Sequence, residues 1–454
     1  MAETGILDDT ITYESEVIEA RFPKSGPAHG SLDRPQPTRR TRDILQQHHF
    51  CRTPSGEHVT TAVPTASAKQ DERRLIGVAC GAHALHDGYT DLVYVMLPIW
   101  QAEFGLGFAA LGLMRTVFSG TLAGFQIPAG FLAERFGTAA VLALGTAMAG
   151  LGYIFAGLSG GVVTLVIALF IGGLGASTQH PLASSLIAHA FSGTRSLKAL
   201  GTYNFAGDIG KMTVPVAAAL LILVLPWRDA LMLLGAFGAI GAVAIFLLIP
   251  RLGDEIAASD KKDESVRPAG AVGAYAFPLL LSVGVIDSAT RMAFLTFLPF
   301  VLTAKGASLQ TVGLALTLVF AGGAVGKLVC AFIGARIGAV ATVWLTEAVT
   351  AFGIVALLPL PLEAAMILLP VVGIALNGTS SVLYGSVPAL VEPQRRQRAF
   401  SIFYTGTIGA GAISPAIYGV LGDAVGVPTA LTVVAAVVLV TLPITFILRP
   451  SLPK

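Results

Sequence analysis

The sequence predicts an all-α integral membrane protein with twelve transmembrane helices in two six-helix, pseudo-symmetric halves. The prediction depends on a shortage of charge, a series of apolar blocks and an internal repeat. Of the 454 residues, 54% are hydrophobic and only 12% are charged, with a mean hydropathy of +0.75, whereas soluble proteins carry about 25% charged residues. Moreover, 21 of the 56 charged residues fall in the first 74 positions. The rest of the chain is therefore suited to a lipid bilayer.

Residues 1–74 are polar, rich in Pro, Thr, Glu and Arg, and lack the apolar run of a signal peptide. This composition is typical of disorder, so we expect a disordered cytoplasmic tail. The alternative is a natural start further along the chain, which would leave the remaining predictions unchanged.

After residue 74, apolar blocks alternate with short polar or glycine-rich breaks. Each block reaches the length of about 20 residues that crosses a bilayer. The stretch between Arg135 and Arg195 contains no Asp, Glu, Lys or Arg, which excludes a soluble helical bundle there. The predicted spans are 75–99, 108–132, 138–158, 162–190, 199–225, 229–250, 273–303, 309–332, 339–360, 364–390, 399–421 and 429–449.

Basic residues set the expected orientation, because Lys and Arg collect in cytoplasmic loops. With an inside amino terminus, the outside loops carry only Arg228 and Lys305. The inside loops carry Arg135, Arg195, Lys198, Arg251, Lys261, Lys262, Arg267, Arg336, Arg395, Arg396 and Arg398. We therefore expect both termini in the cytoplasm, at the cell inner (plasma) membrane. The charged stretch 251–272 is the expected cytoplasmic loop between a six-helix bundle at 75–250 and a second at 273–454.

The two halves repeat at an offset of 200 or 201 residues. Asp87 corresponds to Asp287, Arg135 to Arg336, and Pro215 to Pro415. Parallel repeats around a midplane site are a known plan of transporters. The repeat therefore favours alternating access to a central site.

Charged side chains inside the spans are candidates for function, because each costs roughly 2.5–3.5 kcal/mol on insertion scales. Asp87 and Asp91 lie one helical turn apart on one face of the first span. Two acids this close in a low dielectric repel each other when both are ionised, which suits proton exchange. With His83 and His86 they form the predicted proton-coupling group. The alternative for the histidines is a buried ring that is satisfied by a backbone carbonyl.

A second set of polar residues is predicted to line the central substrate cavity. Asp287 and Arg291 share a face at i, i+4, and so do Asp208 and Lys211 at i, i+3. His180 precedes Pro181, which bends the helix and frees a carbonyl. Static ion pairs between helices remain the alternative for these charges. The predicted cavity residues are Arg115, His180, Asp208, Lys211, Asp287 and Arg291.

Depth in the membrane predicts two ion pairs. Asp91 lies about as far before the first outer loop as Arg115 lies after it, so we expect the two to pair. Glu347 and Lys327 lie at similar distances from the turn at Arg336, so they are a second candidate pair.

Several function classes are excluded on the sequence. No phosphate-binding loop, zinc motif or nucleophile elbow occurs, so we expect neither an enzyme nor an ATP-driven pump. The three cysteines show no paired spacing, and the net charge of +2 does not indicate a nucleic-acid partner. We expect no cofactor, no metal and a monomer, whose partners are a small-molecule substrate and protons.

The segment Gly130-x-x-x-Glu134-Arg135-x-Gly137 resembles the signature loop of the major facilitator superfamily. The resemblance covers nearly all of the chain after residue 74. It implies the major facilitator fold and an inner gate formed by Gly130, Glu134, Arg135, Gly137 and the repeat copy Arg336. The trailing basic residues of the signature are absent, and the copy at Arg336 lacks the acid.

Within that superfamily, the first span is similar to the fosmidomycin-resistance efflux family. His83, His86-Asp87, Leu97-Pro98 and the following Gln101–Phe104 carry this resemblance, as does His180-Pro181 in the fourth span. It implies proton-coupled efflux, as a drug-resistance antiporter, of a small anionic or amphiphilic compound such as fosmidomycin. A proton-coupled importer of a small organic anion is the alternative. A non-transporting membrane sensor is the third class.

Overall fold

The computed structural model describes residues 51–52, 58–59, 66–191, 194–249, 275–392 and 396–452. It divides into two units, Met1–Pro64 and Thr65–Lys454. In the first unit, the strands β1 (Cys51–Arg52) and β2 (His58–Val59) pair antiparallel, which the sequence did not predict. The rest of the predicted tail before residue 66 lies outside the described residues, as does the predicted loop 251–272.

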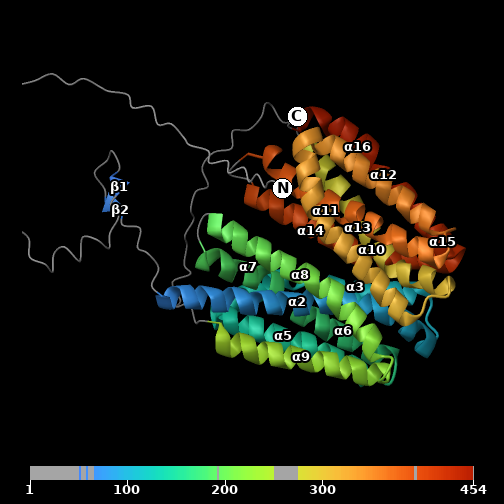
Figure 1. The fold of residues 1–454 in the computed structure, drawn as a ribbon, viewed down its shortest axis with the longest axis horizontal. Helices are drawn as coiled ribbons and strands as arrows, with labels where there is room; N and C mark the ends of the chain where they lie inside the picture. Colours follow the sequence, from blue (N-terminus) through green and yellow to red (C-terminus); the bar gives the residue numbers. More distant parts are fainter. Residues whose placement is uncertain are drawn as a thin grey trace, which may run out of the picture. The chain divides into compact units, whose positions relative to one another are not determined.

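The second unit is a bundle of helices (Figure 1). The helices α2 to α9 form the N-terminal half, and α10 to α16 form the C-terminal half. Their bounds are α2 (Ala66–Phe104), α3 (Phe108–Gly124), α4 (Gln126–Phe136), α5 (Thr138–Gly157), α6 (Val162–Ala176), α7 (Gln179–Ala190), α8 (Thr194–Leu221), α9 (Trp227–Leu248), α10 (Ala276–Ala304), α11 (Leu309–Ile337), α12 (Ala339–Leu357), α13 (Leu362–Ser386), η1 (Val387–Ala389), α14 (Arg396–Val425), α15 (Val427–Val438), α16 (Thr441–Leu448) and η3 (Arg449–Ser451).

Each predicted span coincides with a long helix or with two consecutive helices. Among the described helices, nine are long and apolar enough to cross a membrane, and the pair α3–α4, bent by 43°, makes a tenth. The helices α2 and α8 also cover predicted spans, but they carry the charged residues of the site and fall short in apolarity. The helices thus agree with the all-α membrane fold that the sequence predicted.

The fourth span is interrupted where a polar sequence precedes a proline. Helix α6 ends at Ala176 and α7 begins at Gln179, two residues before Pro181. Proline is tolerated in the first turn of a helix, where its missing N–H has no intrahelical acceptor. The break lies next to His180, so the predicted local disruption is present, although it comes before that histidine.

Glycines in the left-handed conformation repeat between the halves. Gly105 (φ 64°) and Gly306 (φ 86°) follow the first helix of each half, and Gly137 (φ 87°) and Gly338 (φ 84°) follow the second span. Residues with a Cβ rarely adopt this conformation. Both pairs are 201 residues apart, which matches the repeat predicted from the sequence.

The apolar cores show where the halves meet. One core cluster joins both halves and includes residues of α2, α3, α10, α11, α13 and α15. Two smaller clusters each stay within one half. One contains residues of α2, α4, α5, α7, α8 and α9, and the other contains residues of α10, α11, α12, α13, α14 and α16. The halves therefore share a core at the end that contains Trp100 and Leu302, and they have separate cores at the opposite end.

Hydrogen bonds between the halves agree with this division. Those recorded among the described residues link Tyr94 to Met292, Phe108 and Ala109 to Asp423, Gln310 to Ala219, Thr317 to Met212, and Lys327 to Asp208. We call the end with the shared core the closed end and the end with separate cores the split end.

Candidate functional site

A cavity of about 280 Å³ lies between the two halves. Its lining combines many charged and polar side chains with a few apolar ones. The N-terminal half contributes Asp87, Asp91, Arg115, Gln126, His180, Asp208 and Lys211, and the C-terminal half contributes Ser288, Arg291, Lys327, Asn377, Tyr384 and Thr407. Seven residues that the sequence analysis predicted to be functional therefore line one cavity. They are Asp87, Asp91, Arg115, His180, Asp208, Lys211 and Arg291.

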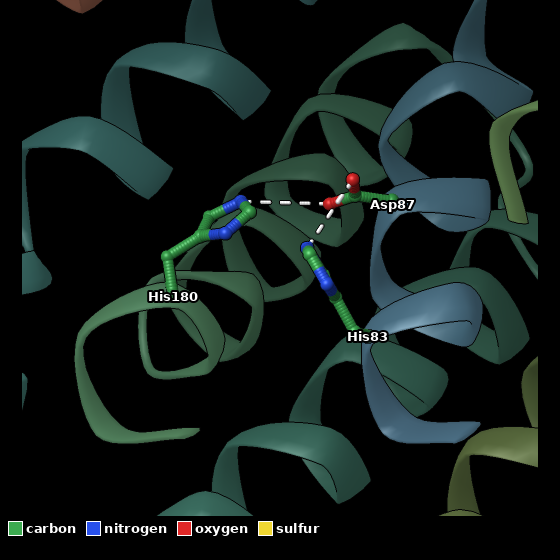
Figure 2. A group of neighbouring side chains, drawn as sticks. All are labelled: His83, Asp87 and His180. Carbon is green, nitrogen blue, oxygen red and sulfur yellow. Dashed lines mark ion pairs between the residues drawn. The ribbon is translucent and has the colours of Figure 1, made fainter. Parts of the chain in front are cut away.

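Asp87 is the centre of a cluster of basic groups. Its Oδ2 lies 3.2 Å from Lys211 Nζ and 3.4 Å from His83 Nε2, and its Oδ1 lies 3.5 Å from His180 Nε2. Figure 2 shows the two imidazole rings approaching the carboxylate from α2 and from α7. Asp87 is buried, whereas the His180 side chain is 45% exposed to the cavity. The cluster therefore connects a buried carboxylate with the cavity surface.

The packing of α8 on α2 fixes the position of His83. Its Nδ1 lies 2.7 Å from the Tyr203 carbonyl oxygen, so the N–H donates there and Nε2 faces Asp87. A Cβ on Gly207 would lie 2.6 Å from Asp87 Oδ2, and one on Gly210 would lie 1.8 Å from the Ala84 carbonyl oxygen. These glycines allow the close approach of the two helices on which the cluster depends.

The same three side chains have the spacing of metal ligands. One ring nitrogen each of His83 and His180 and a carboxylate oxygen of Asp87 all lie within 4.8 Å of one another. However, the Lys211 ammonium already contacts this carboxylate, and a second cation beside it would be repelled. We therefore treat the cluster as an ion-pair site, and the absence of a metal stays a prediction.

The predicted pair of Asp91 and Arg115 is confirmed. Arg115 Nη2 lies 3.9 Å from Asp91 Oδ1 and donates a hydrogen bond of 3.0 Å to the Tyr94 hydroxyl. Its guanidinium also stacks 4.5 Å from the centre of the Tyr94 ring, and Tyr94 in turn donates to Met292 Sδ of the C-terminal half. Arg115 Nε and Nη1 are buried and have no hydrogen-bond partner among the described residues.

Asp208 has a different partner from the one that helical spacing suggested. Both of its oxygens accept hydrogen bonds from Lys327 Nζ, at 2.6 and 2.8 Å, across the interface between the halves. Lys211, three residues from Asp208, contacts Asp87 instead. The predicted pairing of Lys327 with Glu347 is therefore wrong, because Lys327 faces α8 rather than α12.

Arg291 lines the cavity from α10, one turn after Asp287. Among the cavity cations within the described ranges, Arg115, Lys211 and Lys327 each have an ion pair, and Arg291 has none within 4.0 Å. Its buried Nε has no hydrogen-bond partner in the part of the chain that the structure describes. Asp287, predicted to line the cavity, is only 4% exposed and is not among the lining residues.

His86, predicted to act with Asp87, is turned away from the cavity. Its Nε2 lies 2.9 Å from Thr146 Oγ1 of α5, and the residue is buried. His83 and Asp87 face α8, whereas His86 faces α5. The assignment of His86 to proton exchange therefore has no support from its position.

The predicted inner-gate residues lie at the split end. Glu134 and Arg135 end α4 and are exposed, and Arg336 is exposed in the last turn of α11. Gly130 lies within α4, and Gly137 forms the turn into α5. Among the described residues, no ion pair is recorded for Glu134, Arg135 or Arg336, so a gating contact at this end stays a prediction.

Sequence reasoning missed part of the lining of the C-terminal half. Asn377 packs against Gly323, where a Cβ would lie 2.6 Å from the amide nitrogen, and the Tyr384 hydroxyl lies 3.2 Å from Thr407 Oγ1. These uncharged side chains interrupt apolar runs without a distinctive spacing, so no pattern singles them out. Lys327 was recognisable as a charge within a span, but its partner was not.

Comparison with known proteins identifies the family. The family model described as Major Facilitator Superfamily matches residues 79–286 and 280–454. The "Probable sulfoacetate transporter SauU" of Cupriavidus necator is 26% identical over 78% of this chain and 87% of its own length. The "Fosmidomycin resistance protein" of Escherichia coli is also 26% identical, over 33% of this chain and 36% of its own length.

Solved structures agree on the fold. A bacterial homolog to the human lysosomal transporter Spinster, in an inward-facing and occupied conformation, matches with a TM-score of 0.70 and 16% identity over 86% of this chain and 98% of that one. The nucleoside transporter NupG matches with a TM-score of 0.68 and 14% identity, over 84% and 99% of the respective chains. Since the family model accounts for both halves, this chain belongs to the Major Facilitator Superfamily and is a transporter rather than an enzyme.

Proposed function

We propose that this chain is a proton-coupled transporter of small organic anions, which bind in the central cavity with Arg291 as their anchor. The observation that carries the proposal is the charge arrangement of the lining. Three cations of the lining form ion pairs with acids: Lys211 with Asp87, Arg115 with Asp91, and Lys327 with Asp208. Arg291, the fourth cation of the lining, has no ion pair among the described residues. A guanidinium that lines a cavity without an ion pair favours a carboxylate, sulfonate or phosphonate, because its N–H groups match two anion oxygens.

The names of relatives support this substrate class. Sulfoacetate and L-galactonate appear in the names of two relatives, and each is an organic anion. Fosmidomycin, in the name of a third, is a small anionic phosphonate. The relative named for L-galactonate is 25% identical over 51% of this chain and 55% of its own length.

Proton exchange is assigned to the cluster around Asp87. Its carboxylate touches Lys211, which lines the cavity and can also contact a bound anion. If Lys211 turns toward the anion, Asp87 loses its nearest positive charge and can take a proton through His180, the exposed member of the cluster. Anion binding and proton binding are thereby linked through one lysine.

The membrane orientation extends the proposal. With both termini in the cytoplasm of the inner membrane, the closed end faces outward and the split end faces the cytoplasm. The cavity then opens to the cytoplasm, and the exposed gate residues Glu134, Arg135 and Arg336 are free to form contacts when the split end closes. In alternating access, the halves would separate at the closed end and come together at the split end.

Direction separates two candidates. Export is the direction implied by the likeness of the first span to the fosmidomycin-resistance family. Import is favoured by a specific observation: an anion that draws Lys211 from Asp87 promotes proton binding, so anion and proton would travel together. Proton symport down an inward gradient accumulates the anion.

The test uses purified protein in proteoliposomes with an imposed pH gradient and a fluorescent pH indicator inside. Sulfoacetate, L-galactonate and fosmidomycin are added outside, and proton flux is recorded. Arg291→Gln is compared with Arg228→Gln, since Arg228 is a half-buried arginine outside the cavity that pairs with Glu103. Anion-dependent flux lost in the first variant and kept in the second is the expected result.

The sign of the flux decides the direction of coupling. Co-movement of protons with the anion supports import, and counter-movement supports export. Equal transport by Arg291→Gln and Arg228→Gln would refute the role of Arg291 as the anchor.

A further inference from the structure

Arg115 has more hydrogen-bond donors than its surroundings satisfy. The residue is 2% exposed and contributes to the wall of the cavity from α3. Its Nη2 donates to the Tyr94 hydroxyl at 3.0 Å, whereas Nε and Nη1 are buried without a hydrogen-bond partner among the described residues. A buried donor without an acceptor is destabilising, and more so when it belongs to a charged group. The guanidinium therefore lacks an acceptor that a ligand would supply.

The ion pair with Asp91 does not satisfy these donors. Asp91 Oδ1 lies 3.9 Å from Arg115 Nη2, a distance that balances charge but exceeds the length of a hydrogen bond. Aromatic rings form the other contacts of the guanidinium, whose carbon lies 4.5 Å from the centre of the Tyr94 ring and 5.9 Å from that of Phe118. The charge of Arg115 is thus paired, while two of its nitrogen atoms have no acceptor.

The Tyr94 hydroxyl brings this guanidinium close to Arg291 of the other half. The hydroxyl accepts from Arg115 Nη2 and donates at 3.2 Å to Met292 Sδ, and Met292 directly follows Arg291 in α10. Arg291 Nε is likewise buried without a hydrogen-bond partner in the described ranges. Each half therefore contributes one arginine with unsatisfied donors to the wall of a single cavity of about 280 Å³.

The charge of the lining bears on the charge of the ligand. The lining contains three aspartates and four arginine or lysine side chains, so it has one excess positive charge when His180 is neutral. A monoanion neutralises this charge alone. A dianion leaves one negative charge, which is costly inside a membrane unless a proton binds with it. A dianion is therefore the ligand whose binding requires the proton that the proposed function assigns to the cluster around Asp87.

We propose that the preferred substrate is a small dianion with two acidic groups on a short spacer, which Arg291 binds at one end and Arg115 at the other. This inference rests on the proposed function, in which Arg291 is the anchor. The Arg115 guanidinium turns from Tyr94 toward the ligand, because its unsatisfied donors are covered in the described state. The turn breaks one hydrogen bond, and the second acidic group offers two oxygen atoms in its place.

Two sulfonates of similar size isolate the effect of the second acidic group. Sulfoacetate has a sulfonate and a carboxylate, whereas isethionate has a sulfonate and a neutral hydroxyl. Binding of each is measured by isothermal titration calorimetry with the purified native protein, Arg115→Gln, Asp91→Asn/Arg115→Gln and the control Arg228→Gln, which changes an arginine outside the cavity. The double variant keeps the charge of the lining and leaves no unpaired carboxylate, so it serves where Arg115→Gln alone does not fold.

The native protein and Arg228→Gln should bind sulfoacetate at least about tenfold more tightly than isethionate, because a hydrogen bond to a charged group contributes about that factor or more. Both Arg115 variants should lose this preference and bind isethionate as the native protein does. Equal affinity of the native protein for the two anions would overturn the second site. A preference that persists in the folded double variant would do the same.

The proton is counted in the same titrations, repeated in weakly buffered solution. Uptake of about one more proton with sulfoacetate than with isethionate supports the charge argument, and equal uptake contradicts it. Arg291→Gln should weaken the binding of both anions, since it removes the anchor. If neither anion binds the native protein, the proposed function itself is wrong, whereas equal binding of both refutes only the second site.

Discussion

The carboxylate of Asp423 joins the two halves at the closed end. Asp423, on α14, accepts hydrogen bonds from the backbone N–H groups of Phe108 (2.7 Å) and Ala109 (2.9 Å) at the start of α3. The N-cap residue of α3 is Gly107, which has no side chain to satisfy these groups. Asp423 therefore caps a helix of the opposite half, and its negative charge is matched to the positive end of that helix.

Replacing Asp423 by alanine should weaken the closed end without harming either half. Loss of an N-cap side chain costs about 1 kcal/mol, and the exposure of this site excludes a much larger value. Since the contact can exist only while the halves touch, the whole loss acts on the equilibrium between closed and open forms. We expect about a fivefold shift toward opening, by the arithmetic of population shifts. Asp423→Asn keeps an acceptor and should give a smaller shift.

The shift is measurable as a distance distribution. Spin labels at Gly160 and Glu363, exposed positions at the closed end of each half, report separation by double electron–electron resonance. Asp229→Ala is the matched control, because Asp229 is an exposed acid in the first turn of α9 at the same end. Identical distributions in Asp423→Ala and Asp229→Ala would refute the reasoning.

Three further substitutions test the packing. Gly112→Ala would place a Cβ 2.1 Å from a backbone carbonyl oxygen of α14, so it should force the closed end apart and increase the same label distance, whereas Gly120→Ala meets nothing within 4 Å and should not. Lys327→Met leaves Asp208 without its partner; because the lysine side chain is 38% exposed, we expect a loss of only about 1–2 kcal/mol, seen as a lower apparent Tm in detergent. Gly137→Ala requires an alanine at φ 87°, which should cost about 1 kcal/mol and lower the apparent Tm, and a Tm equal to that of the unmodified protein would contradict the turn geometry.

The depth of a charged side chain in the membrane could be predicted from the sequence. The neighbouring helix toward which that side chain points could not. The pairing of Asp91 with Arg115 was predictable because a loop of three residues joins α2 to α3 and fixes their relative depth. The same argument failed for Lys327 and Glu347. Equal depth does not fix the face on which a side chain lies, and in a bundle each face meets a different helix.

The same limit explains His86. Its spacing from His83 and Asp87 allows all three to point in similar directions on a helical wheel, but α2 is wrapped by α8 on one side and α5 on another. The boundary between those faces runs between His86 and Asp87. The sequence does not indicate this boundary, because α2 has no exposed residue between Ala82 and Trp100 that would mark an outer face.

Contacts between the halves were the hardest feature to predict. Asp208 with Lys327 and Asp423 with Phe108 are separated by 119 and 315 residues, and each depends on how one half docks on the other. The repeat predicted the architecture of each half because local helix formation and short turns determine it. It contained no information on the docking angle.

The charge pairs of the cavity have an electrical consequence. Asp87 with Lys211, Asp91 with Arg115, and Asp208 with Lys327 are neutral as pairs. These pairs therefore add no net charge to the centre of the empty carrier, and their movement across the membrane does no work against a potential that would cost about 2.3 kcal/mol per charge at 100 mV. Arg291 has no ion pair among the described residues, so the potential would act on its charge until an anion neutralises it.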